Sequence, residues 1–190
     1  MSTNINLIGV SARKRMGKDT FFEIFNDFAG NIYECKKFAG KLKTICSIIT
    51  GKPEYKFYDG SYCEEFLPEW NLTIREIQQK IGTELFRDSL NEDVWVKSLF
   101  VDFEQTSKWI ITDVRFPNEI ESIKSNGGIV VRIINPNVKD LSNHASETSL
   151  DNYKDWDYII YNDGTLDDYK IKIKELYNKT KGDTNDTFTS

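Results

Sequence analysis

The residues with the clearest chemical potential lie near the start of the chain, where a Gly-Lys pair ends a short basic loop. An apolar run over residues 6–11 leads into Arg13-Lys14-Arg15, and Gly17-Lys18 then opens an amphipathic helical pattern. In this strand–loop–helix context, backbone N–H groups surround a phosphate and the lysine reaches its outer oxygens. The three basic residues reverse the sign of charge locally in a chain of net charge −5. We therefore predict a phosphate loop that binds a nucleoside triphosphate.

The loop departs from the usual phosphate-loop pattern at two positions. Ala12 stands where the pattern has its first glycine, and Asp19 stands where it has a serine or threonine, with Thr20 next. A methyl group at Ala12 crowds a turn that glycine would leave open. The hydroxyl that follows the lysine normally contacts Mg²⁺, so Asp19 either takes that place, directly or through water, or points away. The alternative for the whole segment is a surface turn with a solvated basic run.

A second group of charged residues follows a later apolar run. Trp109-Ile110-Ile111-Thr112 has the composition of a buried strand, and Asp113 and Arg115 come directly after it. A carboxylate at such a strand end can hold Mg²⁺, and the planar guanidinium can bind a phosphate through two parallel hydrogen bonds. The alternative is an ordinary strand-end pair that caps the helix beginning at Asn118.

Apolar runs alternate with helical patterns along the chain, which is typical of a parallel α/β architecture. We predict a three-layer α/β/α sandwich with a five-stranded parallel sheet, in which ligands bind beyond the carboxyl ends of the strands. Thr73 and Glu76 form a capping-box pattern at one helix start. The predicted strands cover residues 4–11, 32–38, 109–113, 129–134 and 158–161, and the predicted helices 17–28, 41–49, 73–88, 91–105, 118–125 and 165–177.

Length and composition limit the organisation and the class of the protein. The 190 residues favour one domain over residues 1–179, with a helical insertion at about 50–106, a lid-like segment at about 136–153 and a disordered tail at 180–190. The acidic balance argues against a general nucleic-acid-binding protein. Three scattered cysteines and a single histidine argue against a Cys/His zinc site and fit a reducing, cytoplasmic compartment. No window of the sequence is apolar enough for a membrane span.

The chain resembles the phage-type deoxynucleoside monophosphate kinases, which have the fold of the P-loop nucleoside monophosphate kinases. The resemblance covers most of residues 5–178, and it accounts for Asp19, because Gly-Lys-Asp is a usual form of the loop in this group. Ala12 remains a departure. The matching segments are Lys14-Arg15, Gly17-Lys18-Asp19-Thr20, Phe38 to Lys43, Arg75, Gln79 to Glu84, Trp95-Val96-Lys97, Asp113-Val114-Arg115, His144 to Glu147 and Asn162-Asp163-Gly164.

This resemblance implies an enzyme that transfers the γ-phosphoryl group of ATP to a deoxynucleoside monophosphate with Mg²⁺ as cofactor. Lys18, Arg15, Asp113 and Arg115 would be the catalytic residues, and Asp19, Thr20 and Asp113 the metal ligands. The residues implied for ATP are Arg13, Lys14, Arg15, Gly17, Lys18, Asp19, Thr20, Asn162 and Gly164. Those implied for the acceptor are Lys43, Arg75, Gln79, Gly82, Thr83, Arg87, Trp95, His144 and Glu147.

Several of these residues also have a plainer interpretation. Lys43, Arg75 and Arg87 would be solvated helix charges, and Trp95 a core residue. His144 in an irregular segment is more often incidental than functional, and Asn162-Asp163-Gly164 is also a common turn sequence. Which of these interpretations holds depends on which side chains the fold brings together.

Two rival functions share much of this pattern. One is a kinase of another small phosphorylated acceptor, such as phosphomevalonate, whose animal kinases have a stretch like Leu150-Asp151-Asn152. The other is a nucleotide-binding module without transferase activity, against which the arginines and the tryptophan of residues 73–105 argue. The resemblance is compatible with a homodimer, and with the host cytoplasm as location if the chain is viral.

Overall fold

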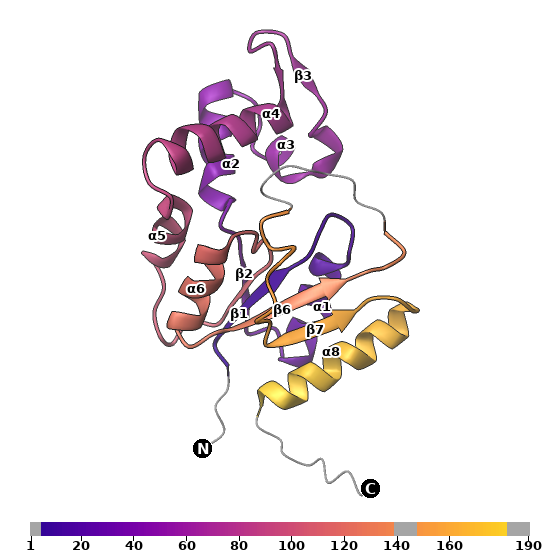
Figure 1. Cartoon of the computed structure of the whole chain (residues 1–190). Helices are drawn as coiled ribbons and strands as arrows, with labels where there is room; N and C mark the ends of the chain where they lie inside the picture. The colour runs from indigo at the N-terminus through magenta and orange to yellow at the C-terminus, as the bar shows by residue number, and fades with distance from the viewer. Residues whose placement is uncertain (1–4, 139–147, 182–190) are drawn as a thin grey trace, which may run out of the picture. The chain divides into compact units, whose positions relative to one another are not determined.

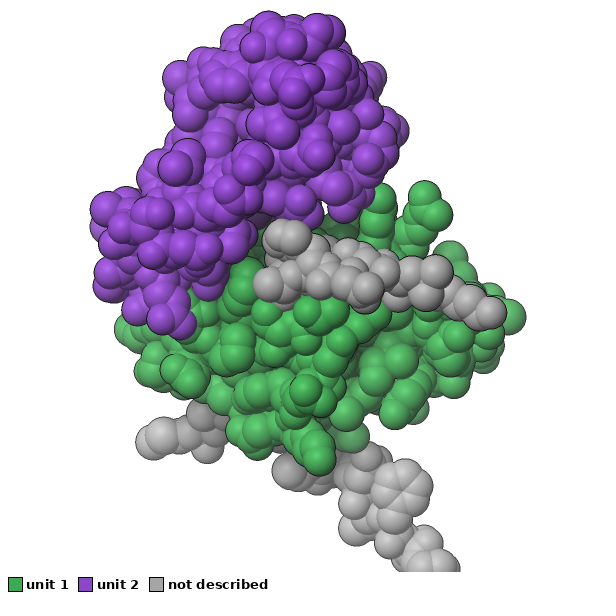
Figure 2. All heavy atoms as spheres, turned by 45° about the horizontal axis from the view of Figure 1, so that its top comes forward, with its two compact units in different colours: residues 1–36, 104–190 green, residues 37–103 purple. Residues whose placement is uncertain are grey.

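The computed structural model describes residues 5–138 and 148–181. The chain forms two compact units, coloured differently in Figure 2: the first comprises Met1–Lys36 with Glu104–Ser190, and the second Lys37–Phe103. The second unit starts before the expected insertion at 50–106, because helix α2 (Gly40–Thr50) packs within it. His144 and Glu147 lie outside the described residues.

A five-stranded parallel sheet forms the centre of the first unit (Figure 1), and the predicted architecture is confirmed. The strand order is β2-β5-β1-β6-β7, so the first strand is central and both of its neighbours come from much later in the chain. Each strand pairs in parallel register, for example Gly9 with Ile111 on one side and with Val130 on the other. The strands are β1 (Leu7–Ser11), β2 (Glu34–Lys36), β5 (Trp109–Ile111), β6 (Ile129–Ile134) and β7 (Tyr158–Tyr161).

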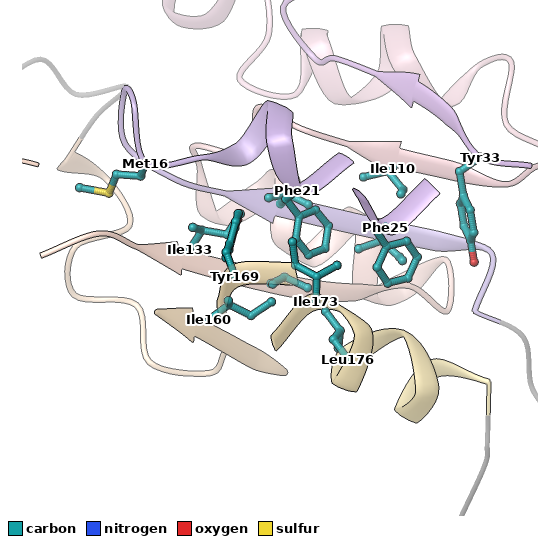
Figure 3. Packing of buried hydrophobic residues seen from close by; sticks show 13 residues of the cluster. Met16, Phe21, Phe25, Tyr33, Ile110, Ile133, Ile160, Tyr169, Ile173 and Leu176 are labelled. Atoms are coloured by element: carbon teal, nitrogen blue, oxygen red, sulfur yellow. The ribbon is translucent and has the colours of Figure 1, made fainter. Parts of the chain in front are cut away.

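Helices α1 (Lys18–Phe28) and α8 (Leu166–Thr180) cover one face of the sheet. Alternation along β1 turns Ile8 and Val10 to this face, where they join a cluster with the apolar residues of both helices (Figure 3). Phe21 and Phe25 stack at 5.5 Å between ring centroids. The apolar residues whose spacing predicted these two helices therefore form the faces that the helices bury against the sheet.

Helix α6 (Pro117–Ser125) packs against the other face of the sheet. Its Ile123 lies directly over Gly9, and a Cβ atom on that glycine would stand 2.5 Å from the Ile123 Cδ1 atom. With helices on both faces, the first unit has the predicted three layers.

The second unit consists of helices and one hairpin. Its segment Thr50–Trp70, which has no clear period, contains α3 (Tyr55–Tyr58), a 3₁₀ turn (Gly60–Tyr62) and the first strand of the hairpin. The remaining elements are α4 (Ile74–Gln79), a π-helix (Lys80–Asp88), α5 (Val94–Phe100) and the hairpin strands β3 (Phe66–Leu67) and β4 (Leu72–Thr73).

Two of the helices predicted for this unit differ in detail. The capping box of Thr73 and Glu76 forms as predicted, but the helix changes to π geometry at Lys80, which hydrophobic spacing does not reveal. The helix predicted over 91–105 begins only at Val94, because the Asn91 side chain accepts a hydrogen bond from the Asp93 N–H at 2.9 Å and forms a turn instead. Among the described residues, no helix is both long and apolar enough to cross a membrane.

The contact between Gly9 and α6 gives a test of this packing. We expect Gly9→Ala to lower the free energy of unfolding by about 1–3 kcal/mol, because the new methyl group overpacks the sheet–helix interface. Urea denaturation of the full chain measures the loss. Adding Ile123→Val removes the Cδ1 atom, so the double variant should recover much of the stability; equal loss in both variants would contradict this packing.

Candidate functional site

The loop between β1 and α1 has the backbone geometry of an anion-binding turn. Arg15 and Gly17 both have positive φ angles, 65° and 100°, and the Met16 side chain between them is buried. Alternation of this kind turns successive N–H groups to one side of the chain. Gly17 is also the N-cap of α1, and the first N–H groups of a helix have no partner within it. The loop can therefore surround a phosphate with N–H donors.

The basic residues of the loop do not all have the same surroundings. Lys14 and Arg15 are exposed, and the Lys18 Nζ atom lies 3.3 Å from the Asp19 carboxylate. Arg13 instead forms an ion pair with Asp151. The exposed side chains of Lys14 and Arg15 can follow an incoming phosphate, whereas Arg13 is already bound to a carboxylate of the same unit.

Asp151 lies between two arginines. Besides Arg13, it has Arg132 at 3.9 Å, and Arg132 donates a hydrogen bond of 2.8 Å to the Ser11 Oγ atom at the end of β1. The arginine of β6 and the carboxylate after the undescribed segment thus fix the entry to the loop. Arg132 did not stand out in the sequence, and Asp151 was noted only as part of a stretch shared with another kinase group, because their contacts with the loop exist only once β6 is placed beside β1.

Residues of the last strand and helix hold the loop from behind. The Asn162 Nδ2 group donates to the Met16 carbonyl at 3.2 Å, and the Tyr169 hydroxyl donates to the Gly17 carbonyl at 3.1 Å. Burial raises the pKa of Tyr169, so the hydroxyl keeps its proton and remains a donor. Asn162, expected to contact ATP, thus contacts the loop backbone.

Gly164 has a local packing role. A Cβ atom there would stand 2.6 Å from the Asp168 carboxylate, which receives hydrogen bonds from the Thr165 N–H and hydroxyl at the start of α8. These bonds hold the pKa of Asp168 below its usual range. The glycine is therefore needed for the capping turn that leads into α8.

Asp113 and Arg115 follow β5 at the same end of the sheet as the loop. The Val114 N–H donates to the Val10 carbonyl at 3.2 Å, which ties this segment to the end of β1. Glu119, only 2% exposed, accepts hydrogen bonds from the Arg115 N–H at 2.7 Å and the Phe116 N–H at 3.1 Å. The fold therefore brings together the two charged groups predicted from the sequence. A glutamate three residues after a helix N-cap is a recognisable signal, and it identifies Glu119.

The carboxylates of this edge suit a magnesium ion better than a softer metal. Asp19, Thr20 and Asp113 offer oxygen donors only, and Mg²⁺ is usually held by one or two carboxylates together with substrate phosphates and water. Within the described part of the chain, no cluster of three or more His, Cys, Asp or Glu side chains forms a metal cage. The donor set thus fits an ion that arrives with a phosphate ligand.

In the second unit, two of the basic residues predicted for the acceptor have defined partners. Arg75 donates from Nε to Glu64 at 2.8 Å and from Nη2 to the Cys63 Sγ atom at 3.1 Å. These contacts use two of the five N–H donors of a guanidinium. The Lys43 Nζ atom lies 4.5 Å from the centre of the Tyr58 ring. Both side chains are oriented by neighbours rather than extended into solvent.

The other acceptor candidates lie at the end of α4, which carries Gln79, in the π-helix and in α5. Arg87 is buried, and Gln79 and Thr83 are half-buried. Gly82 faces Leu42, whose Cδ2 atom would lie 2.7 Å from an added Cβ. The Gly82 carbonyl accepts a hydrogen bond of 2.9 Å from the Trp95 indole.

Trp95 is a core residue of the second unit. Only 5% of it is exposed, and its ring lies 5.3 Å from that of Phe86. This burial favours the core interpretation over stacking on a base. The indole joins α5 to the π-helix, and so it supports the backbone that carries the neighbouring candidates.

Comparison with known proteins gives a consistent result. The family model described as deoxynucleotide monophosphate kinase matches residues 61–173. A protein of Acanthamoeba polyphaga mimivirus with the provisional name of deoxynucleotide monophosphate kinase is 28% identical over 184 residues, which are 88% of this chain and 93% of that protein. The deoxynucleotide monophosphate kinase of Enterobacteria phage T4 is 28% identical over 111 residues.

The chain covers only 45% of the length of the phage T4 protein. Among solved structures, the dephospho-CoA kinase from Campylobacter jejuni has a TM-score of 0.50 at 18% identity, over 93% of this chain and 98% of that one. This likeness concerns the fold. The phosphate loop lies before the matched segment 61–173, so its geometry is a separate observation.

The buried carboxylate of Glu119 allows a test of the strand end. We expect Glu119→Ala to lower the free energy of unfolding by about 2–3 kcal/mol, because the partly buried N–H groups of Arg115 and Phe116 lose a charged acceptor. Chemical denaturation measures this. The exposed Glu121 on the same helix is the matched control, and Glu121→Ala should change stability by less than about 0.5 kcal/mol. Equal effects of the two variants would contradict the role given to Glu119.

Proposed function

The chain belongs to the deoxynucleotide monophosphate kinase family and is a nucleotide kinase, and we propose that it transfers the γ-phosphoryl group of ATP to a deoxynucleoside 5′-monophosphate. The products are ADP and the deoxynucleoside diphosphate. One observation carries this proposal. The left-handed Gly17 opens α1 at the same end of the sheet as Asp113 and Arg115.

The donor half of the reaction belongs to the first unit. The N–H groups at the start of α1 and the Lys18 ammonium bind the phosphates of ATP, with Lys14 and Arg15 adding positive charge. Asp19, Thr20 and Asp113 would hold Mg²⁺, which would supply positive charge to offset that of the phosphates. Arg115 reaches the transferring group from the adjacent strand end. We place the ATP phosphates here because the N-terminus of a helix favours anions.

The acceptor half belongs to the second unit. The acceptor is a phosphate monoester that is already anionic, so its attack on the γ-phosphorus needs no strong general base. Positioning and positive charge are the main requirements of phosphoryl transfer. We assign the binding of the acceptor phosphate to Arg75, whose guanidinium is held by Glu64. Lys43 and Arg87 add positive charge to this half of the site. Gln79 and Thr83 of the same helical stretch are candidates for the nucleoside.

The alternative acceptor, phosphomevalonate, is not favoured by the family match or by the named relatives. The discriminating assay measures ADP release with each of the four deoxynucleoside monophosphates and with phosphomevalonate. Turnover with at least one deoxynucleotide and none with phosphomevalonate is the expected result. Stimulation by phosphomevalonate alone would contradict the proposal, and tight ATP binding without any acceptor-dependent turnover would identify a non-catalytic module.

Lys18 tests the donor site. We expect Lys18→Ala to lower kcat at least about 100-fold, because the lysine neutralises charge that the transition state develops. Coupled ADP release with saturating ATP and deoxynucleotide measures this. Lys170→Ala, a change of an exposed lysine on α8, should retain kcat within about two-fold. Full activity of Lys18→Ala would remove the loop from the mechanism.

Arg75 tests the acceptor site separately from the donor site. We expect Arg75→Lys to raise the KM for the deoxynucleotide about ten-fold or more, because a lysine cannot present two parallel donors to a phosphate. The KM for ATP should stay within about two-fold. Lys80→Ala on the same helical stretch is the control. A change in the KM for ATP alone would place Arg75 outside the acceptor site.

A further inference from the structure

The phosphate loop is held by two hydrogen bonds from a distant part of the chain. Asn162 follows β7 and Tyr169 lies in the first turns of α8, and they donate to the carbonyls of Met16 and Gly17. The partners are 146 and 152 residues apart in sequence. The two acceptors are consecutive residues, so the bonds fix two adjoining peptide groups of the loop.

The geometry of a trans peptide gives these bonds a functional consequence. In a trans peptide, the carbonyl of one residue and the N–H of the next point in opposite directions. Fixing the Met16 carbonyl on Asn162 therefore turns the Gly17 N–H away from Asn162. Fixing the Gly17 carbonyl on Tyr169 turns the Lys18 N–H away from Tyr169 in the same manner. These two N–H groups lie at the start of α1, and a helix N-terminus is suited to bind an anion.

The surroundings of Tyr169 make this arrangement rigid. The residue is 2% exposed and belongs to the apolar cluster between the sheet and α8 (Figure 3). The Gly17 carbonyl also accepts the Phe21 N–H at 2.9 Å, so both of its lone pairs are used. A Cβ atom at Gly17 would stand 2.6 Å from Asn162 Nδ2. Gly17 thus packs closely against both of its loop-supporting side chains, Asn162 and Tyr169.

We propose that Asn162 and Tyr169 are positioning residues of the phosphate loop, which aim the Gly17 and Lys18 N–H groups at the phosphates of the nucleotide. This inference rests on the proposed function, because it takes the loop to bind the donor triphosphate. It replaces the expected direct contact between Asn162 and ATP with an action through the backbone. It also gives a role to Tyr169, which did not stand out in the sequence.

The test compares three variants of the full chain. Tyr169→Phe removes the hydroxyl and keeps the ring, and Asn162→Ala removes the amide donor at a half-buried position. Tyr177→Phe is the matched control, since it removes a hydroxyl two turns further along α8, where the ring packs 5.5 Å from Phe25. Calorimetry measures the Kd for ATP and for inorganic tripolyphosphate, both with Mg²⁺. Kinetic assays give the KM values for ATP and deoxynucleotide.

We expect Tyr169→Phe and Asn162→Ala each to weaken ATP and tripolyphosphate by about 3- to 10-fold, the range of one hydrogen bond. In both variants, the KM for the deoxynucleotide should stay within about two-fold of the wild-type value. In the control variant Tyr177→Phe, every Kd and KM should stay within about two-fold of wild type. Combining the two changes should cost less than the product of the single effects, because both act on one loop. A melting curve for each variant verifies folding, since a purely structural role lowers the melting temperature without changing the Kd of the folded protein.

Two outcomes overturn the inference while leaving the proposed function in place. In the first, Lys18→Ala loses both ligands but Tyr169→Phe and Asn162→Ala bind them as wild type does. In the second, the two variants lose affinity for ATP and not for tripolyphosphate, which would place both residues at the adenine. Failure of the wild-type chain to bind either ligand would overturn the proposed function and the inference with it. If Tyr169→Phe does not fold, Asn162→Ala decides the question.

Discussion

The left-handed backbone at Gly17 is the constraint on which the site depends. At this φ angle of 100°, a side chain would strike Asn162, and only glycine lets the loop enter α1 with its N–H groups directed outward. The helix then supplies further N–H donors at its N-terminus, and Lys18 adds a positive charge. Because β1 is the central strand, the turn is placed beside the ends of β5 and β6. The charged residues of those strand ends reach the same edge for that reason.

The loop is supported by side chains from three later segments. Arg132 of β6 binds Ser11, Asp151 binds Arg13, and the β7–α8 segment contacts the carbonyls at Met16 and Gly17. Glu119 supports the turn after β5 in the same way, by accepting a hydrogen bond from the Arg115 N–H. A preorganised site needs such supporting contacts, since phosphoryl transfer depends on position more than on reactive groups.

The second unit shows how one sequence pattern can have two outcomes. Arg75 and Trp95 both belong to the segments that resemble the family, but one carries a partly exposed guanidinium and the other a buried indole. The indole binds the Gly82 carbonyl, so Trp95 and Gly82 form part of the framework. The Arg75 guanidinium contacts Glu64 and Cys63 through two of its five N–H donors, and it is the group that we propose for the acceptor phosphate. The π-helix between them sets the spacing of Arg87 and Thr83, and a hydrophobic pattern read at 3.6 residues per turn does not predict that spacing.

The sequence by itself determined the phosphate loop, the α/β class with a parallel sheet, the order of the main elements and the capping box of Thr73 and Glu76, because patterns among residues that are close in the chain indicate each of them. Alternation and helical periodicity identify which faces are buried. Only the tertiary structure decided that Asn162 and Tyr169 hold the loop, that Asp151 binds Arg13 and that Trp95 is core. Those contacts join residues that are far apart in the chain, and they exist only once β1 lies between β5 and β6, with α8 against α1. Local spacing carries no information about such neighbours.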